Sequence, residues 1–358
     1  LELARRNQVT LPATTVEGLG QWYTFTDFAH FIEIYLTISS CICSADDIEL
    51  IAREFLRGQA AQNIQHSEVT FTPYTHFSLN RQIPFEDQLA ALSRARQWAA
   101  EEFGISVNWV LDISRNVRPI EHGLTVADWV ISGKEHGVVA LGLGGPENGH
   151  PPELFAEAFD RVLAAGMASV PHAGEVAGAE SVWGALRELK AQRIGHGVRC
   201  LEDPALVAEL RQRQIPLEVC PTSNVCLGVA ASIADHPLPR LLAKGLYVTI
   251  NSDDPPMFNT TLTDEYLKIA EAFDFSREII EQLVFNAVRA NQLTEQAPIE
   301  DQCRFIPSGQ QIDGAFDLQN FSAVGQFPSL FDVRRELISL NFEVAFEIDV
   351  EDFVTFSP

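Results

Sequence analysis

Seven short apolar stretches, each ending in polar residues, recur along the middle of the chain. Segments of helical pattern lie between them, as in Glu153–Phe159 and Ala205–Leu210. Short apolar runs that alternate with amphipathic segments of about 10–15 residues are typical of βαβ units, whose strands form a parallel sheet. We therefore expect one strand in each of seven stretches: His66–Pro73, Ser106–Ser114, Val138–Gly145, Met167–Glu175, Arg193–Val198, Pro216–Asn224 and Tyr247–Asp254.

The number of strands points to a barrel that is one strand short. A closed barrel of alternating strands and helices has eight strands. The chain opens with Leu1–Asn7, which has helical character and which no strand precedes. We predict an α/β fold, a (β/α)8 TIM barrel that lacks its first strand in this chain. The alternative, a doubly wound open sheet, calls for a G-x-G-x-x-G turn after its first strand, and Gly142–Pro146 does not match that motif.

The pattern changes near the end of the chain. The helical pattern stops near Leu293, and Pro298 and Pro307 follow. We predict a boundary there, with the barrel at residues 1–298 and an acidic, Phe-rich tail at residues 299–358. Apolar residues alternate in the tail, as in Phe342–Val350, which favours a small β appendage or a foreign segment. The tail carries no pattern of catalytic residues, and we assign it no function.

Composition narrows the class of protein. Apolar residues make up 46% of the chain and charged residues 21%, which excludes a mainly disordered protein. The formal net charge is −24, the wrong sign for neutralising phosphates, so we expect no nucleic-acid partner. No apolar run reaches the roughly 20 residues of a membrane span, so we expect none. The cysteines are scattered without a C-x-x-C pair, which is typical of free thiols in the cytoplasm.

Polar residues gather at the ends of four expected strands, in the strings Pro171–Glu175, Arg193–Gly197, Cys220–Asn224 and Asn251–Pro255. Catalytic groups of α/β barrels project from the carboxyl ends of several strands. A single histidine at such a place is more often structural. Three strand ends that each carry histidine, glutamate or aspartate favour a catalytic site instead.

These residue types suit metal-assisted hydrolysis. Histidine and carboxylate bind Zn²⁺, so His172 and Asp253 are candidate metal ligands. Zinc lowers the pKa of a bound water toward about 7, and a nearby acid or base can then transfer protons. Glu175 and His196 are the candidates for this transfer. A hydrolase with two metals and a bridging lysine is disfavoured, because the lysines lie outside the strand ends.

Four strings, His172–Glu175, Arg193–Gly197, Cys220–Asn224 and Ser252–Pro255, resemble the adenosine deaminase family in order and spacing. The resemblance extends over about residues 1–295. It implies an amidohydrolase-type barrel that hydrolyses the C–NH₂ bond of a 6-aminopurine, with Zn²⁺ as cofactor. It also implies one role for each matching residue: His172 and Asp253 bind zinc, Glu175 protonates the ring nitrogen, His196 orients or deprotonates the water, and Asp254 and the backbone N–H of Gly145 hydrogen-bond the purine.

One departure from the family bears on the metal. The family's first strand carries a His-x-His pair that supplies two more zinc ligands, and this sequence has no such pair. Two ligands are too few for tight catalytic zinc, so we expect this chain to bind zinc weakly. A catalytically impaired barrel that binds purine nucleosides without turnover is the alternative. Six other histidines could be considered as zinc ligands in place of this pair, but we expect them at the surface: His66, His76, His122, His136, His150 and His236.

Three substrates are compatible with the resemblance: adenosine, adenine and 6-amino-6-deoxyfutalosine. Gly145 and Gly195 are present where adenine-specific relatives tend to differ, which favours a nucleoside deaminase over an adenine deaminase. The strings Glu68–His76 and Asp112–Asn116 resemble a bacterial subgroup in which some members deaminate 6-amino-6-deoxyfutalosine. Adenosine and this metabolite therefore both remain candidates.

The expected partner is a small-molecule purine nucleoside. Phe28 and Phe31 lie at helical spacing early in the chain, and the resemblance implies that they wall the ribose side of the pocket; an ordinary core face has the same pattern. The acidic balance favours a neutral nucleoside over a nucleotide, because a phosphate calls for arginine, lysine or a helix N-terminus. Arg115 and Arg199 are the candidates for a phosphate site.

Overall fold

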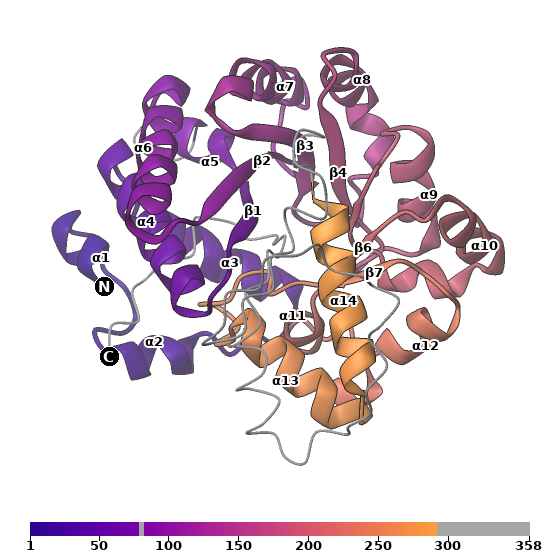
Figure 1. Ribbon diagram of the computed structural model, residues 1–358. Helices are drawn as coiled ribbons and strands as arrows, with labels where there is room; N and C mark the ends of the chain where they lie inside the picture. The colour runs from indigo at the N-terminus through magenta and orange to yellow at the C-terminus, as the bar shows by residue number, and fades with distance from the viewer. Residues whose placement is uncertain (79–81, 292–358) are drawn as a thin grey trace, which may run out of the picture.

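The computed structural model describes residues 1–78 and 82–291, in which seven parallel strands form one sheet. Each strand lies within one of the seven predicted stretches, so these predictions are confirmed. Figure 1 shows the strands in the middle of the molecule with helices around them. The strands are β1 (His66–Phe71), β2 (Ser106–Ser114), β3 (Val138–Gly144), β4 (Ala168–Ala173), β5 (Ile194–His196), β6 (Leu217–Val219) and β7 (Val248–Ile250).

The strands follow chain order, so β1 and β7 are the two edges of the sheet within the described residues. A buried ion-pair cluster shows that the sheet curls. Arg193, just before β5, pairs with Glu68 on β1 (Nη2–Oε2 2.6 Å) and with Glu218 on β6. Because β1 and β5 are far apart in the strand order, this contact requires the sheet to wrap around its inner face. The curled parallel sheet is the predicted barrel wall, with seven strands in place.

Helices cover the outer face of the sheet, as the amphipathic segments predict (Figure 1). α4 is representative: the Ser44 side chain accepts a hydrogen bond from the Asp47 backbone nitrogen at its start, and Ile48, Ile51 and Phe55 are buried on one face. The α-helices of the described chain are α1 (Glu2–Arg6), α2 (Val16–Trp22), α3 (Phe28–Ser39), α4 (Ala45–Ala61), α5 (Pro73–Ser78), α6 (Phe85–Phe103), α7 (His122–Ser132), α8 (Ala156–Ala164), α9 (Ala179–Arg187), α10 (Pro204–Arg213), α11 (Pro221–Cys226), α12 (Leu238–Ala243), α13 (Leu262–Phe273) and α14 (Arg277–Ala290).

The strands are buried on both faces. All six residues of β1 are buried, polar ones included. The outer faces join one large apolar core with the helices. A separate apolar cluster of Val110, Ala140, Ala168 and Val170 comes from β2, β3 and β4, and we place it on the inner face. It forms a floor inside the barrel, and the polar residues that follow along the same strands lie above that floor.

Several histidines contradict the surface prediction. His66, His76, His122 and His236 are buried. For His66 the prediction failed because a polar partner comes from the neighbouring strand: His66 Nδ1 lies 2.7 Å from Ser106 Oγ. Burial lowers the pKa of His66 to about 4, so this ring is neutral in the folded protein. His136 is exposed, as predicted, and His150 is half-buried.

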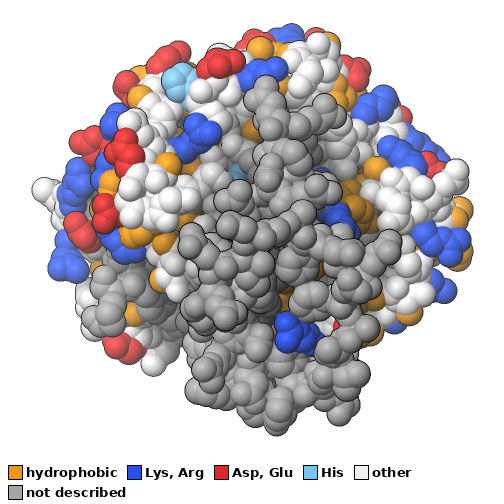
Figure 2. Space-filling model, viewed as in Figure 1, with side chains coloured by type: hydrophobic (Ala, Val, Ile, Leu, Met, Phe, Trp, Pro, Cys, Tyr) orange, Lys and Arg blue, Asp and Glu red, His pale blue; other side chains and the backbone are white. Residues whose placement is uncertain are grey.

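Other predictions stand as follows. The described cysteines are free thiols. No helix within residues 1–78 and 82–291 has the length and apolar character needed to cross a membrane. Side chains of both charges are interspersed over the described surface seen in Figure 2. The predicted boundary near residue 299 and the tail at residues 299–358 lie outside the described residues.

Candidate active site

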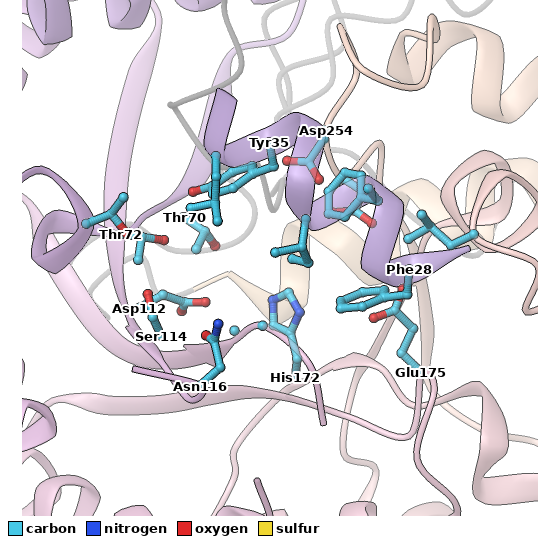
Figure 3. A pocket seen from close by; sticks show the side chains of 18 of the residues that line it. Phe28, Tyr35, Thr70, Thr72, Asp112, Ser114, Asn116, His172, Glu175 and Asp254 are labelled. Atoms are coloured by element: carbon cyan, nitrogen blue, oxygen red, sulfur yellow. The ribbon is translucent and has the colours of Figure 1, made fainter. Parts of the chain in front are cut away.

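A cavity lies at the carboxyl ends of the strands, with a volume of about 980 Å³ including its open mouth. Figure 3 shows His172, Glu175 and Asp254 around it. All eight residues selected from the sequence line this cavity. Six come from strand ends, namely Gly145 after β3, His172 in β4, Glu175 after β4, His196 in β5, and Asp253 and Asp254 after β7. The other two, Phe28 and Phe31, come from α3.

Four of these side chains are close neighbours. His196 Nε2 lies 3.7 Å from Glu175 Oε2 and 3.9 Å from Asp253 Oδ2. The rings of His172 and His196 meet edge to face, with centroids 5.1 Å apart. Two imidazoles and two carboxylates therefore converge at one end of the cavity. Such a set can hold a metal ion and transfer protons beside it.

Backbone conformation helps to aim these side chains. His196 and Asp253 have φ values of 60° and 56°. Residues other than glycine rarely adopt this backbone conformation, and those that do are often found at functional sites. The neighbouring glycines are sterically required. Gly174 has a φ of 75°, and a Cβ there would collide with Val182; Gly197 has a φ of 66°. The glycines in the strings His172–Glu175 and Arg193–Gly197 thus serve the turns that present the polar residues.

Glu175 sits in an environment that favours its protonated form. Its side chain is buried, and burial raises the pKa to about 7, with Asp253 and Glu147 adding to the rise and His196 and His172 opposing it. Within the described chain its Oε1 atom has no hydrogen-bond partner. A buried carboxyl group with a free oxygen and a pKa near neutrality is suited to give a proton to a bound ligand.

Glu147 anchors the loop that carries Glu175, a role that the sequence did not reveal. Its buried carboxylate accepts hydrogen bonds from four consecutive backbone nitrogens and from a hydroxyl. The donors are Gly174, Glu175 and Val176 (each 2.8 Å), Ala177 (3.3 Å) and Ser181 Oγ (2.5 Å). Burial alone would raise the pKa of Glu147, but the Arg115 charge and these hydrogen bonds outweigh it and lower the pKa. Glu147 is therefore an ionised anchor.

Arg115 fixes the neighbouring strand ends. Its Nη2 atom donates to the carbonyl oxygens of Leu143 (2.9 Å) and His172 (2.6 Å), and the residue is fully buried. Arg199, the other candidate for a phosphate site, pairs with Glu202 and with the Val176 carbonyl. Neither arginine lines the cavity, so both are engaged in holding the protein rather than a phosphate.

A second missed group sets the tautomer of His196. The Leu238 backbone N–H donates to His236 Nδ1 (3.1 Å), so neutral His236 carries its proton on Nε2, which donates to Asn224 Oδ1 (3.0 Å). Asn224 Nδ2 then faces His196 Nδ1 at 3.5 Å. Burial lowers the pKa of His236 to about 4, in keeping with its neutral form. The chain of bonds leaves the His196 proton on Nε2, toward Glu175 and Asp253.

Two sets of residues could hold a metal ion. Possible ligand atoms of His196, Cys220 and Asp253 lie within 4.8 Å of one another, whereas the sequence selected His172 and Asp253. Cys220 is buried and does not line the cavity, while His172 does. A metal that activates water needs access to that water, so the cavity-lining His172 and Asp253, with His196 beside them, fit zinc better. Asp253 belongs to both sets.

The purine-contacting candidates also have defined settings. Gly145 has a φ of 88°, and a Cβ there would press on Asn116 Oδ1 at 3.1 Å. Asp254 is buried at the edge of the cavity. Phe31 stacks on Phe258, with centroids 5.5 Å apart, and contacts Phe28. The two phenylalanines therefore pack in the core and also form a wall of the cavity. Both interpretations of their helical spacing, a core face and a pocket wall, apply.

Comparisons with known proteins match most of the chain. The family model for adenosine deaminase matches residues 1–300. The aminodeoxyfutalosine deaminase of Streptomyces avermitilis is 42% identical over 298 residues, 82% of this chain and 81% of that protein. The adenine deaminase of Chlorobium phaeobacteroides is 35% identical over 297 residues, 83% of this chain and 87% of that protein.

Solved structures show the same fold. The crystal structure of an adenine deaminase from Arthrobacter aurescens is similar with a TM-score of 0.77 at 32% identity, covering 82% of this chain and 89% of that one. An amidohydrolase from Burkholderia ambifaria with bound Zn has a TM-score of 0.74 at 25% identity, covering 82% and 81% of the two chains.

Proposed function

This chain belongs to the adenosine deaminase family and is a hydrolase that acts on C–N bonds, and from that premise we propose that it is a zinc-dependent deaminase of 6-aminopurine nucleosides. In the proposed reaction a C6–O bond forms from water, the C6–N bond breaks, and ammonia leaves. The observation that carries the proposal is the Glu175 carboxyl group, buried beside His196 and Asp253 with a pKa raised to about 7.

Glu175 acts as the acid in this proposal. Water adds to an aromatic carbon only at the cost of aromaticity, so the adjacent ring nitrogen must be protonated as the C–O bond forms. A carboxyl group with an ordinary pKa would have lost its proton at neutral pH, whereas the raised pKa keeps it available. The partnerless Oε1 atom of Glu175 is the atom we assign to the ring nitrogen.

His196 and Asp253 act on the water. With its proton held on Nε2 by the Asn224 contact, His196 donates a hydrogen bond to the attacking water and orients it. The Asp253 carboxylate, 3.9 Å from that nitrogen, accepts one proton of the water and returns it to the amino group, which leaves as ammonia. The remaining proton of the new C6–OH group returns to Glu175. This assigns orientation to His196 and proton acceptance to Asp253.

His172 and Asp253 are the residues that would hold zinc. When bound, zinc would acidify the water so that it reacts at neutral pH. A site with two ligands, and with His196 nearby, is open and would hold zinc weakly. The affinity for zinc therefore needs to be measured. The family is metal-dependent, and a neighbour of the same fold contains Zn.

The remaining candidates orient the purine. We assign the Gly145 backbone N–H and the Asp254 carboxylate to the ring nitrogens, and Phe28 and Phe31 to the apolar face of α3 that excludes water from the ring. Adenine is the second candidate substrate, because several relatives are named adenine deaminase. Adenosine and aminodeoxyfutalosine differ from adenine in carrying a ribose, so one wall of the cavity distinguishes the two classes.

The test is the loss of ultraviolet absorbance on deamination, measured with adenosine, aminodeoxyfutalosine and adenine in the presence of added zinc. We expect turnover of a nucleoside, abolished in Glu175→Gln. Glu157→Gln, an exposed glutamate on α8, is the matched control. Absence of ammonia release from all three substrates with zinc in excess would overturn the proposal.

A further inference from the structure

α13 carries a pair of opposite charges that lies behind the cavity rather than in its lining. Glu265 is fully buried, and the partly exposed Lys268 places its Nζ atom 3.6 Å from Glu265 Oε1. Neither residue has a role in the reaction as proposed above. Burying a carboxylate costs free energy unless the group is paired and hydrogen-bonded, so the contacts of Glu265 indicate what it does there.

One oxygen of Glu265 caps the start of α11, the short helix that follows β6. The Thr222 backbone N–H, in the first turn of α11, donates to Glu265 Oε2 at 2.9 Å. The first N–H groups of a helix have no partner within the helix, and a carboxylate there is stabilising. Cys220, the residue just before α11, directs its thiol to the Glu218 carbonyl instead of to the helix start. α13 therefore supplies the cap, and Figure 1 shows the two helices next to each other.

The other oxygen of Glu265 holds the segment that follows β7. Thr260 Oγ1 donates to Glu265 Oε1, and this segment begins with the candidate catalytic residues Asp253 and Asp254. Lys268 Nζ joins the two contacts, because it donates to Thr222 Oγ1 (2.7 Å) and to Thr260 Oγ1 (2.9 Å). The pair on α13 thus ties the strand end of β6 to the strand end of β7.

The first turn of α11 also carries the group that faces His196. Asn224 is two residues after Thr222 and is fully buried, and its backbone N–H donates to the Cys220 carbonyl at 2.9 Å. Its Nδ2 atom lies 3.5 Å from His196 Nδ1. This distance is at the long limit for a hydrogen bond, so a small displacement of α11 would break the contact. The placement of this turn therefore decides whether Asn224 can set the tautomer of His196.

We propose that Glu265 and Lys268 are positioning residues: they hold the first turn of α11 so that Asn224 keeps the proton of His196 on Nε2, where it can orient the attacking water. The inference rests on the function proposed above and adds to it two residues outside the cavity. Because neither residue lines the cavity, their effect on the reaction passes through Asn224.

The experiment reads the tautomer directly. ¹⁵N NMR of the imidazole groups shows which nitrogen of a ring carries the proton, at about pH 8, where histidine is ordinarily neutral; the His196 signals are those lost in His196→Ala. The test variants are Glu265→Gln and Lys268→Met. Glu271→Gln, an exposed position on the same helix, and Lys244→Met, also exposed, are the matched controls. Thermal melts establish which variants are folded.

We expect the proton on Nε2 of His196 in the wild type and in both controls, and a mixture of tautomers in both test variants. The kcat of the test variants should fall by about 10-fold or more, in the range for residues that orient other ligands, with less change in KM. The double variant Glu265→Gln/Asn224→Ala should lose no more than Asn224→Ala alone, because both changes act on one contact.

Three results overturn the inference: a wild-type ring signal in either folded test variant, an unchanged kcat in either, or losses that multiply in the double variant. If Glu265→Gln does not fold, Lys268→Met decides by the same criteria, with Lys268→Met/Asn224→Ala as the double variant. A chain without deaminase activity refutes the proposed function, and the ring signal then decides whether Glu265 and Lys268 position His196.

Discussion

The Oε1 atom of Glu147 lies 2.8 Å from the backbone nitrogen of Glu175, so one buried carboxylate holds in place the loop that presents the other. The pKa values of the two carboxyl groups are shifted in opposite directions. Hydrogen bonds and Arg115 lower the pKa of Glu147 against the effect of burial, while burial raises that of Glu175 to about 7. The ionised anchor and the protonated acid are thus neighbours with separate tasks.

Glu147→Gln should therefore lower kcat more than it changes KM. The amide keeps one oxygen but loses the charge and part of the set of acceptors for the loop at residues 174–177. A small displacement of a catalytic group costs up to about 100-fold in rate. Steady-state kinetics with the preferred nucleoside measure the effect, with Glu157→Gln as the exposed control. An unchanged kcat would show that the loop does not depend on Glu147.

Glu175→Gln should lower turnover by at least about 100-fold, the usual contribution of a general acid, while nucleoside binding persists. It should also change the dependence of stability on pH. The folded pKa of about 7 lies above the ordinary 4.5, so the stability linked to the protonated carboxyl is complete below 4.5 and is lost as pH rises through 7. The fall in melting temperature between pH 5 and pH 8 should therefore be smaller in the variant than in the wild type. Equal pH dependence in both proteins would refute the raised pKa.

Asn224→Ala and His236→Ala should each lower kcat by about 10- to 100-fold, in the range found for residues that orient other ligands. Asn224→Ala removes the donor to His196 Nδ1, and His236→Ala removes the bond that orients that donor, so both variants allow the other tautomer. Because neither residue itself lines the cavity, KM should change less than kcat. The exposed His136→Ala provides the control. Rates equal to those of the wild type would remove the chain of bonds from the mechanism.

Zinc should be bound weakly by this chain. Dialysis against a chelator should remove zinc and turnover together, and added zinc should restore both in proportion. His172→Ala and Asp253→Ala should need more zinc for the same occupancy, because each removes one of the assigned ligands. Metal analysis after gel filtration gives the occupancy independently of activity. One equivalent of zinc that survives the chelator would contradict the assignment of so few ligands.

Arg193→Ala should destabilise the fold by about 3–5 kcal/mol, because it leaves two buried carboxylates, Glu68 and Glu218, without their cation. Urea denaturation measures the loss. Arg213→Ala removes an exposed pair with Glu209 and should cost less than about 1 kcal/mol. Similar losses in the two variants would mean that the interior cluster contributes no more than a surface pair.

The strands could be predicted from the sequence because a parallel sheet buries both faces and so leaves continuous apolar runs. The string His172–Glu175 was visible for the same reason, since polar residues stand out at the end of such a run. Glu147 and Asn224 gave no comparable signal, because their significance lies in contacts with distant residues: Glu147 with residues 174–177, and Asn224 with His196 and His236.

The histidines show the same limit. His66 and His236 were expected at the surface, but inside the protein His66 Nδ1 lies beside the Ser106 hydroxyl, and His236 contacts the Asn224 side chain and the Leu238 backbone N–H. The pairing of β1 with β2 brings Ser106 opposite His66, 40 residues away in the chain. Pattern along the chain carries no information on such partners.

The space above Gly142 and Gly144 on β3 makes the side chains of β2 and β3 depend on each other. Because the Asp112 side chain occupies the space that Gly142 and Gly144 leave open, a larger residue on β3 is compatible only with a smaller or redirected residue on β2. A side chain at Gly142 or Gly144 would therefore require a change at Asp112 as well.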